Sequence, residues 1–280
     1  MKKLTLTVLL FAHLLTVSGQ TDSDPTFTVT GTRFLLPLFE KFNEALLTDG
    51  QPSPFRITSR NPSASLTATA TPQVPPKPKE GYRQEVLAKI VYLPVVNSRH
   101  PELKTLLSKG LTVEEIKQIF FGKKQDALGF SPKFNVLTRN ACAAVSFSHF
   151  MKEDIKFLVN DHSKIENDSL LLDLIKSDTL SISFLDPSNI YDPLTGKTKE
   201  GITVIPIDSN LDGQIDDNER FYETKERLIQ HIKTGAIELP SGLFVISFSE
   251  DVDERFSDYV KWIKKNGEPV IEDYGFLSVK

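Results

Sequence analysis

The sequence of 280 residues is poor in residues that cross-link a chain, since it has one Cys, and it contains only two Met and one Trp. A single cysteine cannot form an internal disulfide, so the fold must be held by a hydrophobic core, helped at most by a metal ion. An excess of positive charge is also missing, because 33 Lys and Arg residues face 37 Asp and Glu residues. Without a broad basic surface, nucleic acid is excluded as a partner.

Long hydrophobic runs are absent as well, apart from a short one at the start. Met1-Lys2-Lys3 precedes the apolar stretch LTLTVLLFAHLL, and small residues follow up to Gly19. This pattern predicts a secretory signal peptide over residues 1–19, too short to span a bilayer. No cysteine lies near the cleavage point, so we expect a periplasmic or secreted protein without a stable membrane anchor.

Strand-like and helix-like patterns alternate along the rest of the chain. Strand patterns cover residues 26–31, 86–97, 180–185, 202–207 and 243–248, and helix patterns cover 35–47, 112–121, 170–175, 223–234 and 253–266. Thr112 and Glu115 have the spacing of a capping box at a helix start. This alternation predicts the α/β class. Residues 52–79 are rich in Pro, Ser, Thr and Ala without a sustained period, which predicts a loop or linker.

Residues 208–219, DSNLDGQIDDNE, match the twelve-residue loop of a calcium site at every specified position. The side chains of Asp208, Asn210, Asp212, Asp216 and Glu219, with the backbone carbonyl of Gln214, are the expected oxygen ligands of Ca²⁺. A solvated acidic turn is the alternative, because Asp, Asn and Gly also form turns. A strand pattern precedes the loop instead of a helix, so the expected role of Ca²⁺ is structural.

Three short segments are candidates for binding an anion. Gly31-Thr32-Arg33-Phe34 precedes a helix, whose free amides and dipole favour negative charge, and Ser59-Arg60 adds a hydroxyl and a guanidinium. The third segment runs from Arg139 through Cys142 and Ala143 into a helix. Each also has a simpler interpretation: a helix cap, a polar loop, and a strand-to-helix turn with a buried, inert thiol.

Five segments, taken in chain order, are GTRFLLPLFEKF, TSR, VVNSRHP, LTVEEIKQIFFG and YVKWIKKNGEPVIEDYGFLSV. Together they resemble the phosphate-binding solute receptors of bacterial ABC transporters. The acidic insert VIPIDSNLDGQIDDNERFY is similar to that of members from the Bacteroidetes group. The resemblance implies a two-lobed periplasmic-binding-protein fold of type II, monomeric, with phosphate or a related oxyanion in the cleft and a transporter permease as partner. It assigns the anion to Gly31, Thr32, Arg33, Phe34, Ser59, Arg60, Arg139, Cys142 and Ala143.

The chain departs from this family at the anion site. Arg139 is followed by Asn140-Ala141-Cys142-Ala143, where the family has a Ser-Gly-Thr turn, and Pro54 or Phe55 stands where the family has an Asp. Each missing hydrogen bond to a desolvated dianion costs about 1.5–3 kcal/mol. The alternative function is therefore an exported binding or adhesion module of the same fold that has lost phosphate binding.

We expect lobe one to comprise residues 25–97 and 236–280, and lobe two to comprise residues 98–235 with the calcium loop. An enzyme is not expected, because no paired metal-binding His spacing, nucleophile elbow or P-loop is present. The weaker enzymatic alternative is a hydrolase with Cys142 as nucleophile and His149 as base.

Overall fold

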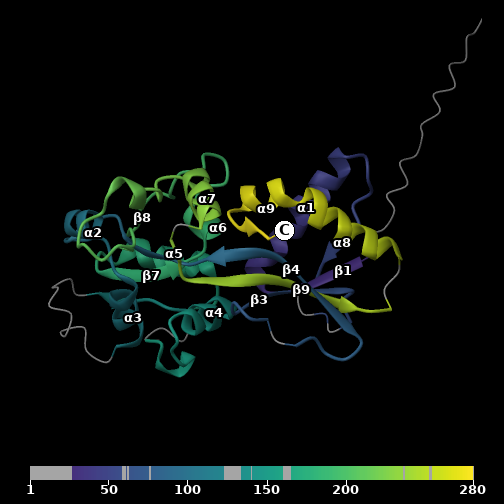
Figure 1. The fold of residues 1–280 in the computed structure, drawn as a ribbon, viewed down its shortest axis with the longest axis horizontal. Coiled ribbons are helices and arrows are strands. Elements are labelled where there is room, and N and C mark those ends of the chain that lie inside the picture. The colour runs from purple at the N-terminus through teal and green to yellow at the C-terminus, as the bar shows by residue number, and fades with distance from the viewer. Residues whose placement is uncertain are drawn as a thin grey trace, which may run out of the picture.

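The computed structural model describes residues 27–58, 61, 63–75, 77–122, 134–139, 141–159, 165–235, 237–251 and 254–279 (Figure 1). The predicted signal peptide and the candidate ligands Ser59 and Arg60 lie outside these residues. Helices and strands alternate through the described chain, so the predicted α/β class is confirmed.

The first sheet has six strands in the order β10-β4-β9-β3-β1-β2. They are β1 (Phe27–Gly31), β2 (Phe55–Ile57), β3 (Leu66–Thr71), β4 (Tyr82–Val91), β9 (Ser241–Ser249) and β10 (Leu277–Ser278). β1 runs parallel to β2 and β3, whereas β9 is antiparallel to β3 and β4. The chain therefore returns from its C-terminal third to complete the centre of this sheet.

The second sheet has four strands in the order β6-β7-β5-β8. They are β5 (Leu93–Asn97), β6 (Asn135–Val136), β7 (Ser181–Leu185) and β8 (Ile202–Val204). β5 lies in this sheet, so the change of sheet falls at Tyr92 and not near Asn97, where we expected it. The predicted lobe limits otherwise stay a prediction.

The two connections between the sheets lie side by side. Tyr92 alone separates β4 from β5, and its backbone N–H donates to the carbonyl of Pro240, 2.7 Å away, just before β9. Both crossings of the chain are thus tied together by one backbone hydrogen bond.

Helices pack on both sheets (Figure 1). They are α1 (Leu36–Thr48), α2 (Leu103–Lys109), α3 (Val113–Phe121), α4 (Cys142–Phe150), α5 (Asp168–Ser177), α6 (Pro187–Ile190), α7 (Lys225–Thr234), α8 (Glu254–Asn266) and α9 (Glu268–Tyr274). α1 contacts β1 and β2 of the first sheet, and α5 contacts β5 and β7 of the second. α4 follows β6 of the second sheet but packs on β3 and β9 of the first.

Local signals explain where several helices begin. The predicted capping box at α3 is confirmed: the Thr112 hydroxyl accepts from the Glu115 amide at 3.1 Å, and the Glu115 carboxylate accepts from the Thr112 amide at 2.8 Å.

The loop predicted over residues 52–79 is wrong in part, because this segment contains β2 and β3. β3 has the small residues Ala68 and Ala70 on its buried face, and α4 packs on this strand.

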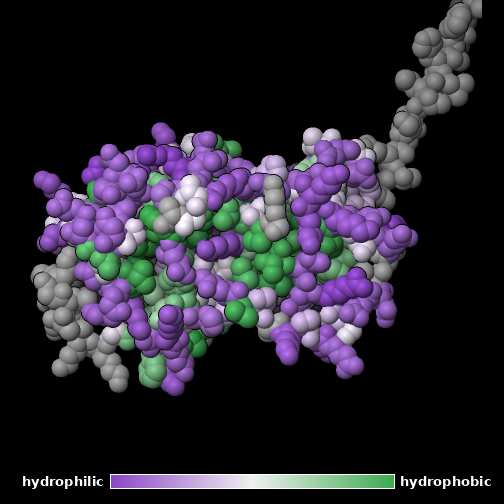
Figure 2. All heavy atoms as spheres, in the orientation of Figure 1, coloured by the Kyte–Doolittle hydropathy of each residue, from purple (hydrophilic) through white to green (hydrophobic). Residues whose placement is uncertain are grey.

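Each sheet has an aromatic core. Phe39 packs edge-on against Phe55 and Phe244 at the first sheet, while Phe147 stacks on Phe184 at the second, with ring centroids 4.0 Å apart. The face in Figure 2 is mostly hydrophilic, with hydrophobic residues gathered in patches between hydrophilic ones. Among the described residues, none of the helices has the length and apolarity needed to cross a membrane.

Candidate functional site

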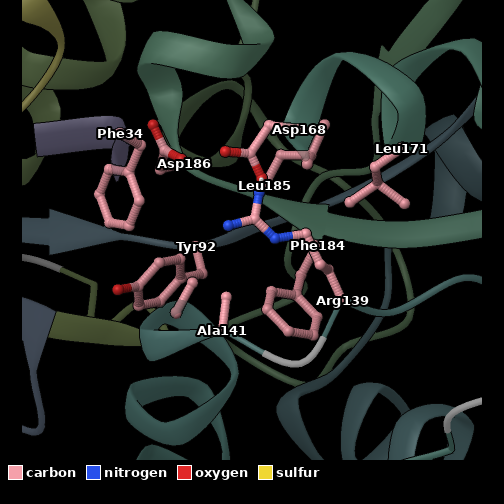
Figure 3. A pocket seen from close by; sticks show the side chains of 10 residues that line it. Phe34, Tyr92, Arg139, Ala141, Asp168, Leu171, Phe184, Leu185 and Asp186 are labelled. Carbon is pink, nitrogen blue, oxygen red and sulfur yellow. Dashed lines mark hydrogen bonds and ion pairs between the residues drawn. The ribbon is translucent and has the colours of Figure 1, made fainter. Parts of the chain in front are cut away.

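A small pocket, here called the inner pocket, lies where the second sheet faces the start of α1 (Figure 3). Its lining residues come from both halves of the fold and are Phe34, Tyr92, Arg139, Ala141, Ala143, Asp168, Leu171, Phe184, Leu185 and Asp186. Its volume of about 20 Å³ is enough for a water molecule but not for an oxyanion. A ligand would therefore have to open it.

Arg139 is already paired inside the pocket. Its guanidinium lies 2.6 Å from a carboxylate oxygen of Asp168, and the two side chains are 12% and 25% exposed. Burial raises the pKa of Asp168, Arg139 and Arg33 act to lower that pKa, and the nearby Asp186 adds to the rise. An anion that binds Arg139 must compete with this carboxylate.

Helix caps place the two acidic side chains. Asn167 caps α5 by accepting from the amide of Leu170 at 2.9 Å, which puts Asp168 at the first residue of the helix. Asp186 caps α6, accepting from the Ser188 amide at 3.1 Å and from the Asn189 side chain at 2.8 Å. Asp186 is thus used to hold the backbone, whereas Asp168 is used to hold Arg139.

The predicted turn that begins at Gly31 leads to Phe34, which lines the inner pocket. Gly31 has φ of +135°, and a Cβ atom there would lie 1.9 Å from the carbonyl oxygen of Ala68, so only glycine fits. The Thr32 hydroxyl accepts from the Ala70 amide at 3.2 Å and donates to the sulfur of Cys142 at 3.4 Å. Thr32 makes no side-chain cap bond; instead it links the first sheet to the start of α4.

Tyr92 closes the pocket near the crossing between the sheets. Its hydroxyl and that of Ser146 are buried, and neither makes a hydrogen bond of normal geometry in the described structure. Burial raises the pKa of Tyr92 far above its usual range, although Ser146 acts to lower it. Tyr92 therefore lines the pocket together with Arg139, while its hydroxyl is buried (Figure 3).

A larger groove, here called the outer groove, adjoins the inner pocket and shares Phe34, Arg139 and Asp168 with it. Its volume is about 350 Å³. The residues that complete it are Arg33, Pro37, Asn167, Ser169, Ser188, Asn189 and Tyr274. Arg33 is exposed and donates to the carbonyl of Glu166 at 3.4 Å, and it lines the groove as a second arginine beside Arg139.

Six of the predicted anion ligands meet at this cleft. Arg33, Phe34, Arg139 and Ala143 line one or both spaces, while Thr32 and Cys142 contact each other beside them. Gly31 precedes them and packs against β3. The sequence analysis missed the residues that come from distant segments, which are Tyr92, Asp168, Phe184, Asp186 and Tyr274.

Cys142 and His149 do not form a catalytic pair. They lie seven residues apart on α4, at opposite ends of the helix, which corresponds to about 10 Å along the axis. The Cys142 sulfur meets Thr32 in the cleft, whereas His149 is exposed. The hydrolase alternative therefore lacks its base.

In the predicted calcium loop, two carboxylates accept hydrogen bonds from backbone amides of the same loop. Asp208 accepts from the amides of Leu211 and Gly213, and Glu219 accepts from the amides of Ser209 and Asn210. The oxygen donors have the chemistry that Ca²⁺ prefers. In the part of the chain that the structure describes, however, no group of three or more His, Cys, Asp or Glu is placed to hold a metal ion. Calcium binding stays a prediction.

Comparison with known proteins supports the fold and goes no further. No family model and no curated protein matches this sequence. Among solved structures, the chain is similar to a putative phosphate ABC transporter substrate-binding protein with bound phosphate from Clostridium perfringens, at TM-score 0.63 and 15% identity over 91% of this chain and 99% of that one. An ABC-type phosphate transport receptor from Vibrio cholerae matches at TM-score 0.59 and 16% identity, over 90% and 99% of the two chains.

The chain has the two-lobed, type II fold of periplasmic binding proteins. The same fold occurs in OxyR from Corynebacterium glutamicum, which matches at TM-score 0.56 and 9% identity over 89% of this chain and 66% of that chain. Because phosphate transport receptors and an H2O2-bound OxyR protein share it, the fold alone does not specify the function. The function has to be argued from the cleft.

Proposed function

We propose that this protein is an extracytoplasmic solute-binding protein that holds phosphate or a related oxyanion between its lobes and delivers it to an ABC transporter permease. The observation that carries the proposal is that Arg33, from the first half of the fold, and Arg139, from the second, line one groove. Two guanidinium groups can bind an oxyanion by charge-assisted hydrogen bonds. The phosphate receptors from Clostridium and Vibrio with the same fold support this choice.

Binding in this proposal is coupled to closure of the lobes. The chain crosses between the sheets at two adjacent places, at Tyr92 and at Pro240, so rotation there changes the width of the cleft. Opening gives the anion access to Arg139, and closure brings the first-lobe Arg33 onto it. Released solute then passes to the permease.

Titration calorimetry of the mature chain with orthophosphate and sulfate tests the proposal. We expect micromolar binding, weakened about tenfold by Arg33→Gln. Arg56→Gln is the matched control, because Arg56 is exposed on β2 and does not line the groove. Equal losses in the two variants would mean that the groove is not the binding site.

A second candidate function is an exported binding module that has lost phosphate binding. The observation that favours it is the 2.6 Å pair of Arg139 with Asp168, which already satisfies the guanidinium in a pocket of about 20 Å³. This candidate predicts no heat of binding with phosphate, sulfate or simple carboxylates. Micromolar binding of any of these anions would exclude it.

We also propose that Ca²⁺ binds the loop at residues 208–219 and stabilises the fold without switching its function. The oxygen donors of this loop support the proposal, and Glu219 would exchange its amide partners for the ion. We expect excess Ca²⁺ to raise the melting temperature by about 3 °C or more relative to chelator. The exposed substitution Asp212→Asn should abolish the shift, and identical melting curves in calcium and chelator would contradict the proposal.

A further inference from the structure

A second cationic space, here called the lysine pocket, lies beside the outer groove and is not used by the proposed oxyanion site. Its volume is about 250 Å³. Lys41 comes from α1, Lys199 from the segment between α6 and β8, and Lys225 from the first turn of α7. Asp273 and Tyr274 at the end of α9 complete it from the side of the first sheet. Both halves of the fold thus contribute to the pocket.

The charges in this pocket do not cancel. Asp273 is its single lining carboxylate, and it pairs with Lys225 at 2.9 Å and with Lys41 at 3.8 Å. Lys225 also donates to the backbone carbonyl of Asp273. Three ammonium groups therefore face one carboxylate, which leaves an excess of positive charge.

Lys199 is the ammonium without a carboxylate partner. Its Nζ atom donates to the carbonyl oxygens of Ser188 at 3.3 Å and Asn189 at 2.9 Å, and no carboxylate of the described residues lies within ion-pair distance. Burial lowers the pKa of Lys199, and the neighbouring Lys176 acts in the same direction, while Asp186 and Asp192 act to raise that pKa. A half-buried cation of this kind gains from an anion that enters the pocket.

The lysine pocket adjoins the outer groove. Ser188 and Tyr274 line both spaces. Tyr274 is held at this junction by its hydroxyl, which donates to the carbonyl of Phe34 at 2.7 Å. The outer groove, with Arg33 and Arg139, and the lysine pocket thus lie on either side of Ser188 and Tyr274, and are here called the arginine end and the lysine end.

We propose that the cleft takes an elongated polyanion with at least two phosphate groups, one at the arginine end and one in the lysine pocket. The proposal rests on the proposed function and specifies its ligand class. A single oxyanion would leave one end unused, whereas a condensed phosphate or an organic bisphosphate carries a second phosphate group for the other end. Inorganic pyrophosphate and tripolyphosphate are the probes for a condensed phosphate, and fructose 1,6-bisphosphate is the probe for an organic bisphosphate.

Calorimetry with these probes and with orthophosphate tests the proposal. We expect at least one of the three polyanions to bind about tenfold or more tightly than orthophosphate. Lys199→Met should weaken that polyanion about tenfold and leave orthophosphate unchanged. Lys197→Met is the matched control, since Lys197 is exposed, lies two residues away and does not line the pocket. Lys41→Met, on the surface of α1, repeats the test should Lys199→Met fold poorly.

The outcomes separate this inference from the proposed function. If orthophosphate binds and no polyanion binds more tightly, the receptor function stands and the elongated ligand is overturned. If Lys199→Met weakens a polyanion while Arg33→Gln does not, the lysine pocket is a separate site and the shared cleft is overturned. Weakening of the polyanion by both variants, with Lys197→Met unchanged, supports the proposal.

Discussion

The arginine end and the lysine end of the cleft carry charge of the same sign but hold it differently. At the arginine end, Arg139 and Asp168 form a 2.6 Å pair whose side chains are only 12% and 25% exposed. At the lysine end, Asp273 is 58% exposed and serves two lysines, while Lys199 has backbone partners. The comparison teaches that an anion must displace a carboxylate at one end but can simply add at the other.

The largest expected difference between the two ends is in the free energy of unfolding, when the Arg139–Asp168 pair and the Lys225–Asp273 pair are broken in turn. Arg139→Gln leaves a mostly buried carboxylate unpaired, and we expect a loss of about 3 kcal/mol in the free energy of unfolding. Lys225→Gln, its counterpart at the lysine end, should cost less than about 1 kcal/mol, because Asp273 remains solvated. Urea unfolding measures both.

The double variant Arg139→Gln/Asp168→Asn is the control for that experiment. It removes both charges, so it should regain most of the stability that Arg139→Gln loses. Equal stability of the single and double variants would show that the loss came from packing and not from the unpaired carboxylate.

Removing the carboxylate at the arginine end should sharpen the contrast in binding. Asp168→Asn frees the Arg139 guanidinium, and we expect sulfate affinity to rise about tenfold at neutral pH. Calorimetry measures the change, with Asp173→Asn on the same helix as the control. An unchanged affinity would mean that the anion does not reach Arg139.

Lowering the pH should weaken the pair of Arg139 and Asp168 and so raise the affinity for sulfate, as Asp168→Asn does. Burial raises the pKa of Asp168 above 3.8, so the folded chain binds more protons than the unfolded chain as pH falls through the raised pKa. Protonation frees Arg139, and we expect sulfate affinity to rise roughly threefold from neutral to mildly acidic pH. Sulfate keeps its charge over this range, which phosphate does not.

The pH effect should disappear in Asp168→Asn. The folded state also gains stability on acidification from this group, because the charged carboxylate is the form that burial disfavours. A sulfate affinity that rises equally in the variant would show that Asp168 is not the group responsible for the pH effect.

The smallest effect is expected at the lysine end. Asp273→Asn removes an exposed carboxylate from a pocket that already has excess positive charge, so pyrophosphate affinity should rise only about threefold. Calorimetry against Asp258→Asn, an exposed position on α8, measures it. If the pyrophosphate affinity of Asp273→Asn rises as much as the sulfate affinity of Asp168→Asn, the two ends do not differ in how strongly their carboxylates oppose an anion.

Much of the fold could be predicted from local patterns, because caps and periodicity are local. The Thr112–Glu115 capping box and the alternation of strands with helices both appear in the structure. β3 could not be recognised in the same way, since LTATAT has little hydrophobic side-chain volume. Its stability comes from pairing with β1 and β9 and from α4, which are contacts between distant segments.

Part of the candidate site could also be predicted from the sequence, and part could not. Arg33 and Arg139 could be selected from the sequence because guanidinium groups near helix starts suit anions. The partner of Arg139 could not, because Asp168 lies 29 residues further along the chain and meets Arg139 only once α5 has packed on its sheet. Tyr274 contacts Phe34 across 240 residues, so the junction of the two pockets is a product of the tertiary fold.

Tyr92 separates β4 from β5, and it also lines the inner pocket. Any rotation of one lobe against the other must change the backbone angles next to a phenol ring that faces the cleft. Closure and occupancy therefore act on one aromatic side chain, so the ring resonances of Tyr92 form a built-in reporter of both, readable by NMR in the unmodified protein.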